Sequence, residues 1–155
     1  GGRQLKVSSA SLTDAGTYTC EASNQAGTDS QDFRLSVHIP ALIERAGLDR
    51  SPKLLENSSH VLECPVAGIP PPSITWLYNG REIDFQQAEG FAIGAGGQKL
   101  VIRRGEVAHS GDYECVAEND AGTDRMQYHL EVYVPPYIVA ALSSPGTPAS
   151  SSTRP

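Results

Sequence analysis

The chain has 155 residues and a formal net charge of -6, from 12 Lys and Arg against 18 Asp and Glu. This acidic balance offers no basic surface for a phosphate backbone, which argues against nucleic-acid binding. The longest apolar stretches, such as 137–142, are far shorter than the roughly 20 residues that cross a bilayer. Fifteen Gly and eleven Pro, against one Met and three Phe, favour short strands and frequent turns, so the composition predicts an all-β protein.

The chain contains an internal repeat. A shift of 95 positions aligns Leu5 with Leu100, Gly16 with Gly111, Tyr18 with Tyr113, Cys20 with Cys115, and 22–29 with 117–124. This period is too long for a solenoid and suits a self-contained β-sandwich, repeated along a tandem array.

The repeat also divides the chain into domains. We expect 1–38 to be the C-terminal half of a truncated domain and 39–134 to be one complete domain. Residues 135–155 are expected to start a next domain and pass into a disordered Ser/Thr/Pro-rich tail. Because Gly1 falls in mid-pattern, the sequence is interpreted as a fragment, and a 38-residue half domain is too short to fold alone.

Within 39–134, short runs with alternating apolar positions predict antiparallel strands. In chain order the predicted strands are 61–66, 73–78, 81–83, 91–93, 99–102, 113–117 and 126–134. Turn residues separate them, with Asn79-Gly80 suited to a tight hairpin, glycines at 94–97, and 119–122 joining the last two strands. Seven or eight strands in two packed sheets are expected.

Four residues of this unit have a specific spacing. Trp76 follows Cys64 by twelve positions, and Tyr113 precedes Cys115 by two. Further residues of the same pattern are 68–72 (Gly-Ile-Pro-Pro-Pro), Leu100, 111–115 (Gly-Asp-Tyr-Glu-Cys) and 119–122 (Asn-Asp-Ala-Gly). With these residues the chain resembles the I-set of the immunoglobulin superfamily. Its junction at 132–138 is most similar to the tandem arrays of the hemicentin family of extracellular matrix proteins.

The resemblance implies an immunoglobulin-like (I-set) antiparallel β-sandwich in which Cys64 and Cys115 form a disulfide. Trp76 then packs on the disulfide, while Tyr113, and Tyr18 in the first copy, fix the adjoining corner. Closing the loop between Cys64 and Cys115 with this bond is expected to stabilise the domain by about 4 kcal/mol in the loop-entropy account.

Two features depart from the family pattern. His109 stands where the first copy has Asp14, so the acidic partner often paired with an arginine at that corner is missing. Cys20 is left unpaired, because its partner would belong to the first half of its own domain.

Asn57-Ser58-Ser59 is an N-glycosylation sequon in a polar stretch where an exposed turn would accept a glycan. The sequence leaves open whether Asn57 is occupied. The four histidines, His38, His60, His109 and His129, are scattered singly. No two of these histidines have the close spacing of a metal-binding pair, so we expect no metal site and no cofactor.

Two further motifs permit a functional and a structural interpretation. Ser110 and Asp112 beside His109 suggest a catalytic triad, but they are neighbours in one turn, which favours the corner and no enzyme activity. Residues 119–122 suit a ligand loop, yet their recurrence at 24–27 favours a turn with Gly122 at positive φ. Similarly, we interpret 70–72 as a rigid bend between strands rather than a polyproline ligand.

The resemblance implies a non-catalytic extracellular module for cell adhesion or matrix assembly. Expected partners are other Ig-repeat, matrix or cell-surface proteins, homophilic binding included, with the open sandwich edges as contact surfaces and no small-molecule substrate. One alternative is the ectodomain of a neural adhesion molecule or receptor. Another is an intracellular, titin-like elastic spacer, in which the cysteines would often be reduced.

Overall fold

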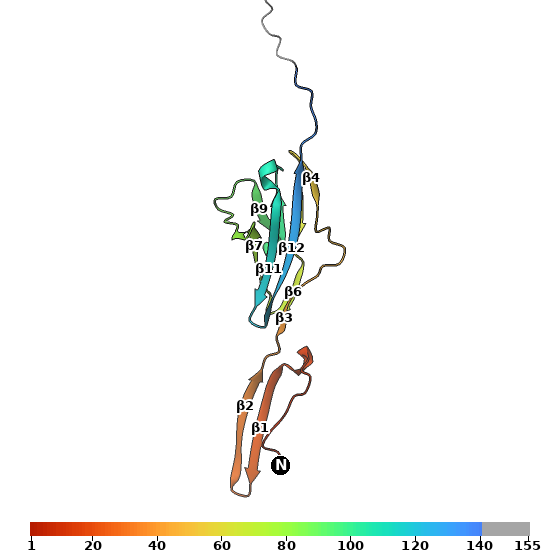
Figure 1. The fold of residues 1–155 in the computed structure, drawn as a ribbon. Coiled ribbons are helices and arrows are strands. Elements are labelled where there is room, and N and C mark those ends of the chain that lie inside the picture. The colour runs from red at the N-terminus through yellow and green to blue at the C-terminus, as the bar shows by residue number, and fades with distance from the viewer. Residues whose placement is uncertain (141–155) are drawn as a thin grey trace, which may run out of the picture.

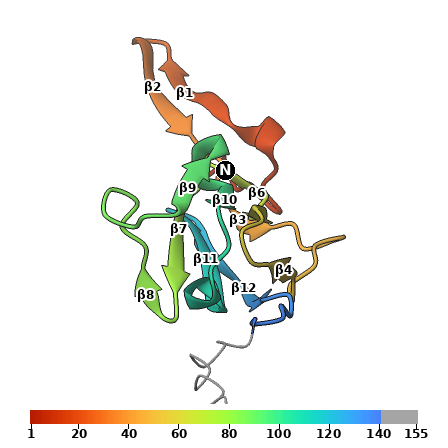
Figure 2. The same cartoon turned by 90° about the horizontal axis from the view of Figure 1, so that it is seen from above.

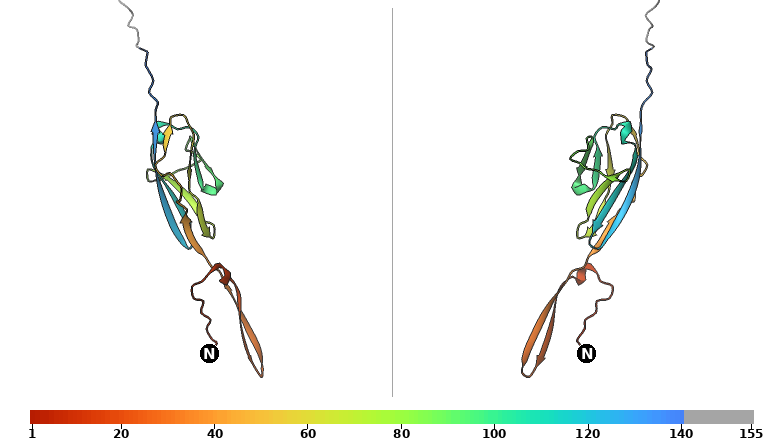
Figure 3. Two further views of the ribbon diagram at one scale, coloured as in Figure 1. Left: turned by 90° about the vertical axis from the view of Figure 1, so that its right-hand side faces the viewer. Right: turned by 60° about the vertical axis from the view of Figure 1, so that its left-hand side comes forward.

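The structure is a computed structural model that describes residues 1–140. The predicted disordered tail at 143–155 lies outside the described residues. A two-stranded hairpin lies at one end of an elongated molecule, followed by a β-sandwich (Figure 1). The chain leaves the sandwich at the end opposite the hairpin, as two further views show (Figure 3).

The hairpin consists of β1 (Gly16–Asn24) and β2 (Gly27–Leu35), preceded by the short 3₁₀ helix η1 (Leu12–Asp14). The two strands pair antiparallel along their whole length. Phe33, which the repeat aligns with a buried position of the sandwich, is 59 % exposed. Within residues 1–140, no second sheet covers this hairpin.

The sandwich has two main sheets. The five-stranded sheet has the order β4 (Lys53–Leu55), β12 (Gly122–Tyr133), β11 (Gly111–Asn119), β7 (Ser73–Tyr78) and β8 (Arg81–Glu82). The three-stranded sheet has the order β5 (His60–Glu63), β10 (Lys99–Ile102) and β9 (Phe91–Gly94). Separate from both, β3 (Ile39–Ile43) pairs with β6 (Val66–Ile69). Two short 3₁₀ helices, η2 (Ala95–Gly97) and η3 (Val107–His109), complete the unit.

Neighbouring strands of the sandwich are antiparallel, except that β4 runs parallel to β12. Seen from above, β4 lies at one edge and the loop between β8 and β9 projects at the other (Figure 2). The core fills the space between the two sheets because every second residue of each long strand points inward. The largest fully buried side chains are Trp76, Tyr113, Leu62, Leu100, Ile102, Met126, Leu130, Cys64 and Cys115.

The predicted all-β sandwich is confirmed, but one predicted strand is wrong. Residues 61–66 form two strands, β5 and β6, because the chain changes partner at Pro65: β5 pairs with β10, whereas β6 pairs with β3. The sequence predicts neither β3 nor β4, so the unit has ten strands, β3 to β12, instead of seven or eight.

The two predicted hairpin turns differ in outcome. Asn79 and Gly80 have φ of 47° and 81°, which confirms the tight turn between β7 and β8. The positive φ expected for Gly122 is wrong, since this residue begins β12 and is not among those with positive φ. Glycine favours the close approach of the linker there, because a Cβ would lie 3.0 Å from the Cβ of Pro40.

Candidate functional site

The core of the sandwich is held by a disulfide between Cys64 and Cys115. Both cysteines are fully buried, Cys64 just after β5 and Cys115 in β11, so the bond joins the two sheets. Trp76 in β7 is the register partner of Cys115 and is 1 % exposed. The bridge and the indole therefore occupy the same layer of the core, at the positions that the resemblance implies.

The indole of Trp76 is also fixed by a hydrogen bond. Its Nε1 donates to the backbone oxygen of Gly97 in η2 at 2.8 Å, which links the two sheets just before β10 begins. The loop can approach this closely because Gly97 has φ of 96° and no side chain, and a Cβ there would lie 3.0 Å from the Cβ of Ile74. Trp76 stacks against Tyr128 with ring centroids 6.3 Å apart.

The same tyrosine corner occurs in both repeats. The hydroxyl of Tyr113 donates to the backbone oxygen of His109 at 2.7 Å, and that of Tyr18 donates to the oxygen of Asp14 at the same distance. Burial raises the pKa of the Tyr113 phenol, so its hydroxyl stays protonated as a donor.

His109 replaces the aspartate of the first copy in one hydrogen bond. In the first copy, a carboxylate oxygen of Asp14 accepts from the backbone N–H of Ser11 at 2.7 Å. In the second copy, Nδ1 of His109 accepts from the N–H of Glu106 at 3.0 Å. Within residues 1–140 neither side chain forms an ion pair, and in both copies the side chain accepts one backbone N–H of the turn.

Ser110, Asp112 and His109 are not arranged as a catalytic triad. The hydroxyl of Ser110 accepts from the backbone N–H of Val132, and Asp112 contacts His129 at 2.7 Å. That contact raises the pKa of His129. In the described part of the chain, no three His, Cys, Asp or Glu side chains gather as metal ligands, and no helix is long and apolar enough to cross a membrane.

Asn119 connects the turn between β11 and β12 to the linker that enters the sandwich. Its Nδ2 donates to the backbone oxygens of Ile39 at 2.8 Å and Pro70 at 3.0 Å. Its Oδ1 accepts from the backbone N–H groups of Ala41, Ala121 and Gly122 at 3.3, 3.1 and 3.0 Å. Beside it, Asp120 contacts His38 of the linker at 3.0 Å. We call Asn119 and Asp120, with 38–41 and Pro70, the linker clamp.

We predict that Asn119→Ala destabilises the sandwich by about 2 kcal/mol, because the two part-buried N–H groups that Asn119 accepts from, those of Ala41 and Gly122, lose their acceptor at about 1 kcal/mol each. Trp76 is the sole tryptophan of the chain, so its fluorescence during urea unfolding reports on the sandwich alone. Asn24→Ala is the matched control, since Asn24 makes the same turn bonds, to Ala26 and Gly27, but none to a linker. Equal midpoints for Asn119→Ala and the unsubstituted chain would contradict the prediction.

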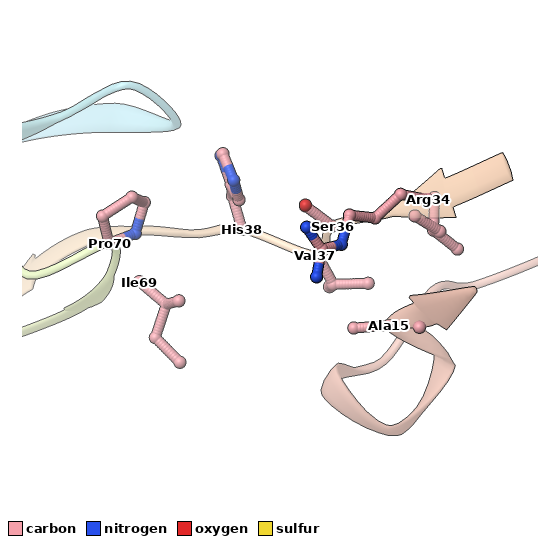
Figure 4. A pocket seen from close by; sticks show the side chains of 9 residues that line it. Ala15, Arg34, Ser36, Val37, His38, Ile69 and Pro70 are labelled. Atoms are coloured by element: carbon pink, nitrogen blue, oxygen red, sulfur yellow. The ribbon is translucent and has the colours of Figure 1, made fainter.

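A shallow groove of about 540 Å³ lies where the hairpin meets the sandwich. Ile69 and Pro70 lie on the sandwich side, and Ala15, Arg34 and Val37 on the hairpin side (Figure 4). His38 and Pro70 of the linker clamp are among the residues that line the groove.

Arg45 is not among the residues predicted from the sequence. It follows β3, the first strand of the sandwich, and binds Asp124 in β12, the last strand. Its guanidinium binds the Asp124 carboxylate in a bidentate pair at 2.7 and 3.0 Å, and the backbone N–H of Ile43 donates to the same carboxylate at 2.8 Å. The Arg45 bond lowers the pKa of Asp124 from 3.8 to about 2. The alignment of Asp124 with Asp29 is the only sequence signal for this pair, because Arg45 has no counterpart in the first copy.

We predict that protonation of Asp124 destabilises the sandwich as the pH falls below about 4. Its pKa is depressed on folding, so its contribution is present above the unfolded value of 3.8 and lost as pH falls through about 2. The pair is partly exposed, which limits the contribution to about 1 kcal/mol. Asp124→Asn should lower stability by that amount at neutral pH. Its urea unfolding midpoint should also fall less, as the pH drops below about 4, than that of the unsubstituted chain. Asp29→Asn, with no arginine partner, is the control and should leave both unchanged.

The remaining predicted residues lie away from the core. Cys20 is a free, exposed cysteine on β1. Asn57 lies in the exposed loop between β4 and β5, at the end of the sandwich where β12 finishes. The structure therefore brings Cys64, Cys115 and Trp76 together and leaves Asn57 and Cys20 at the surface.

The immunoglobulin I-set domain family matches residues 1–37 and 48–132. The chain belongs to this family. It is 41 % identical over 163 aligned residues to mouse hemicentin-1 and 39 % identical to human hemicentin-1, in each case over 99 % of this chain and 3 % of the relative. The chain thus spans only a small part of these relatives.

Solved structures share the fold of this chain. A titin I-band fragment, I67–I69, has a TM-score of 0.68 at 31 % identity and covers 81 % of this chain and 44 % of that one. Sidekick-1 immunoglobulin domains 1–4 have a TM-score of 0.74 at 21 % identity, over 82 % of this chain and 34 % of that one. The second likeness shows the fold alone.

Proposed function

We propose that this I-set chain is a non-catalytic adhesive module of an extracellular protein, acting through protein–protein contacts in cell adhesion or matrix assembly. The observation that carries the proposal is the similarity to hemicentin-1 over nearly the whole chain. The disulfide in the core supports it, because disulfides persist in oxidising compartments. We place the domain boundaries after residues 38 and 134, where the repeat register changes unit.

The structure suggests how such a module works physically. The linker clamp ties residues 38–41 to the turn of the following domain, which favours a defined angle between neighbours. Domains held at fixed spacing present their surfaces in register, so many weak contacts combine into strong attachment. The proposed partners are other Ig-repeat, matrix or cell-surface proteins.

The edges of the sandwich are the proposed contact surfaces. β8 and β9 end their respective sheets on one side, and β4 ends the five-stranded sheet on the other. β8 has only two residues, whereas β9 has four and carries Ile93, which is 43 % exposed. An exposed edge strand offers unpaired backbone groups to a partner strand, so β9 is the better candidate.

Bead aggregation tests self-adhesion. Beads coated with the 155-residue chain are expected to cluster with one another or with beads carrying a matrix or cell-surface Ig array. Clustering only in mixtures would assign heterophilic binding. Beads that stay dispersed with every such partner would contradict the adhesive function.

A peptide map of the native protein without reduction tests the compartment. A linked Cys64–Cys115 peptide is expected for an extracellular module. Free thiols would instead favour an intracellular elastic spacer, an alternative supported by the likeness to titin I67–I69. The ectodomain alternative, supported by 27 % identity to bovine neural cell adhesion molecule 1, predicts the same linked peptide and a cell-surface location.

A further inference from the structure

The sequon is placed in a loop whose backbone is fixed while its side chains stay accessible. The backbone N–H of Asn57 donates to the oxygen of Gly105 at 2.8 Å. Asn57 has φ of 66°, a left-handed conformation that asparagine tolerates better than most residues. Both Asn57 and Ser59 are exposed, so the two recognised side chains of the sequon lie at the surface.

The one side-chain bond of Asn57 leaves its nitrogen free. Its Oδ1 accepts from Nε of Arg104 at 2.8 Å, and no protein group within residues 1–140 bonds to its Nδ2. This orientation directs Nδ2, the atom that a glycan would modify, away from the contact with Arg104. A sugar on Nδ2 is compatible with every hydrogen bond of the loop.

We propose that Asn57 carries an N-linked glycan that covers the exit end of the sandwich. The inference rests on the extracellular location proposed above. In the reaction, Nδ2 attacks C1 of a lipid-linked oligosaccharide diphosphate. An N–C bond forms, the C–O bond to the diphosphate breaks, and Nδ2 loses one proton.

The loop lies directly beside an exposed apolar edge. The backbone N–H of Glu56 donates to the oxygen of Tyr133 at 2.8 Å, which ties the loop to the last residue of β12. Leu55 and Tyr133 are register partners across β4 and β12 and are 59 % and 43 % exposed. A glycan on Asn57, the residue after Glu56, covers Leu55 and Tyr133. It also blocks the open edge of β4, where a strand of another chain could pair.

The same glycan lies close to the segment that leaves the domain. Tyr137 follows Tyr133 by four residues, so it lies within about 14 Å along an extended chain. Tyr137 is 79 % exposed and would be a site for chymotrypsin. The proposal therefore predicts that the glycan protects this segment from cleavage.

The test uses the full chain secreted from cultured animal cells, with Ser59→Ala and Ser59→Thr as variants. Ser59→Ala removes the sequon but keeps the bond between Asn57 and Arg104, whereas Ser59→Thr keeps the sequon. Peptide masses before and after enzymatic glycan removal are expected to show Asn57 occupied in the unsubstituted chain and in Ser59→Thr. The glycan mass should be lost in Ser59→Ala.

Chymotrypsin cleavage after Tyr137 should be several-fold slower in the glycosylated chain than in the same chain after glycan removal. Equal rates would overturn the protective role, and bare Asn57 in both sequon-bearing chains would overturn the glycan. Secretion is imposed by the host cell, so these failures leave the proposed function intact. Free thiols in the native protein would instead overturn the proposed function.

Discussion

Cys115→Ser is expected to abolish cooperative unfolding of the sandwich. The disulfide to Cys64 closes a loop across 51 positions, and its loss removes about 4 kcal/mol in the loop-entropy account. A small domain has a total stability of only about 5–15 kcal/mol. The substitution also places a hydroxyl in a site with no exposure, which adds an unsatisfied polar group.

Urea unfolding followed by Trp76 fluorescence measures this effect, because Trp76 packs beside Cys115 and is the sole tryptophan. Cys115→Ala separates the two contributions, since it removes the bridge without adding a hydroxyl. Cys20→Ser is the matched control, because Cys20 is free and exposed. An unchanged transition in Cys115→Ala would show that the disulfide does not stabilise the sandwich.

The core could be predicted from the sequence because its signals are local. In β11 the buried residues Tyr113 and Cys115 alternate with less buried ones, as period two predicts, and Trp76 is the buried residue of β7 that the motif spacing singles out. The turn at Asn79-Gly80 is fixed by residues that tolerate positive φ. Each of these features depends on a few consecutive residues, which is why pattern and position agree.

The linker clamp could not be predicted because it depends on distant contacts. Asn119 of the clamp binds Ile39 across 80 positions. The same holds for the separate pair of Asp124 and Arg45, which lie 79 positions apart. The repeat shows that the turn at Asn119 occurs twice, but the first copy contains no linker for Asn24 to hold. Strands β3 and β4 escape prediction for the same reason, since they are short and are defined by pairing with β6 and β12.

Gly122 shows how a correct turn can be predicted for the wrong reason. The expected positive φ would give the glycine a purely local role in the turn between β11 and β12. The structure instead places Pro40 of the linker 3.0 Å from where a Cβ of residue 122 would lie. The glycine therefore favours the close packing of Pro40 in the linker clamp.

Trp76→Ala is the second substitution with a large expected effect, a destabilisation of about 3–5 kcal/mol. The indole is 1 % exposed, so its removal leaves a cavity beside the disulfide, and the stacking with Tyr128 is lost. The backbone oxygen of Gly97 also loses its donor. Because this variant has no tryptophan, circular dichroism or calorimetry replaces fluorescence as the measurement.

Trp76→Phe divides the effect into packing and hydrogen bonding. Phenylalanine refills most of the cavity but cannot donate to Gly97, so a loss of about 1–3 kcal/mol is expected from the unpaired oxygen and the remaining volume. Phe33→Ala is the control for removal of an aromatic side chain, because Phe33 is exposed on the hairpin outside the core. If Trp76→Phe proves as damaging as Trp76→Ala, the bond to η2, rather than the volume of the indole, would be what holds the two sheets together at this point.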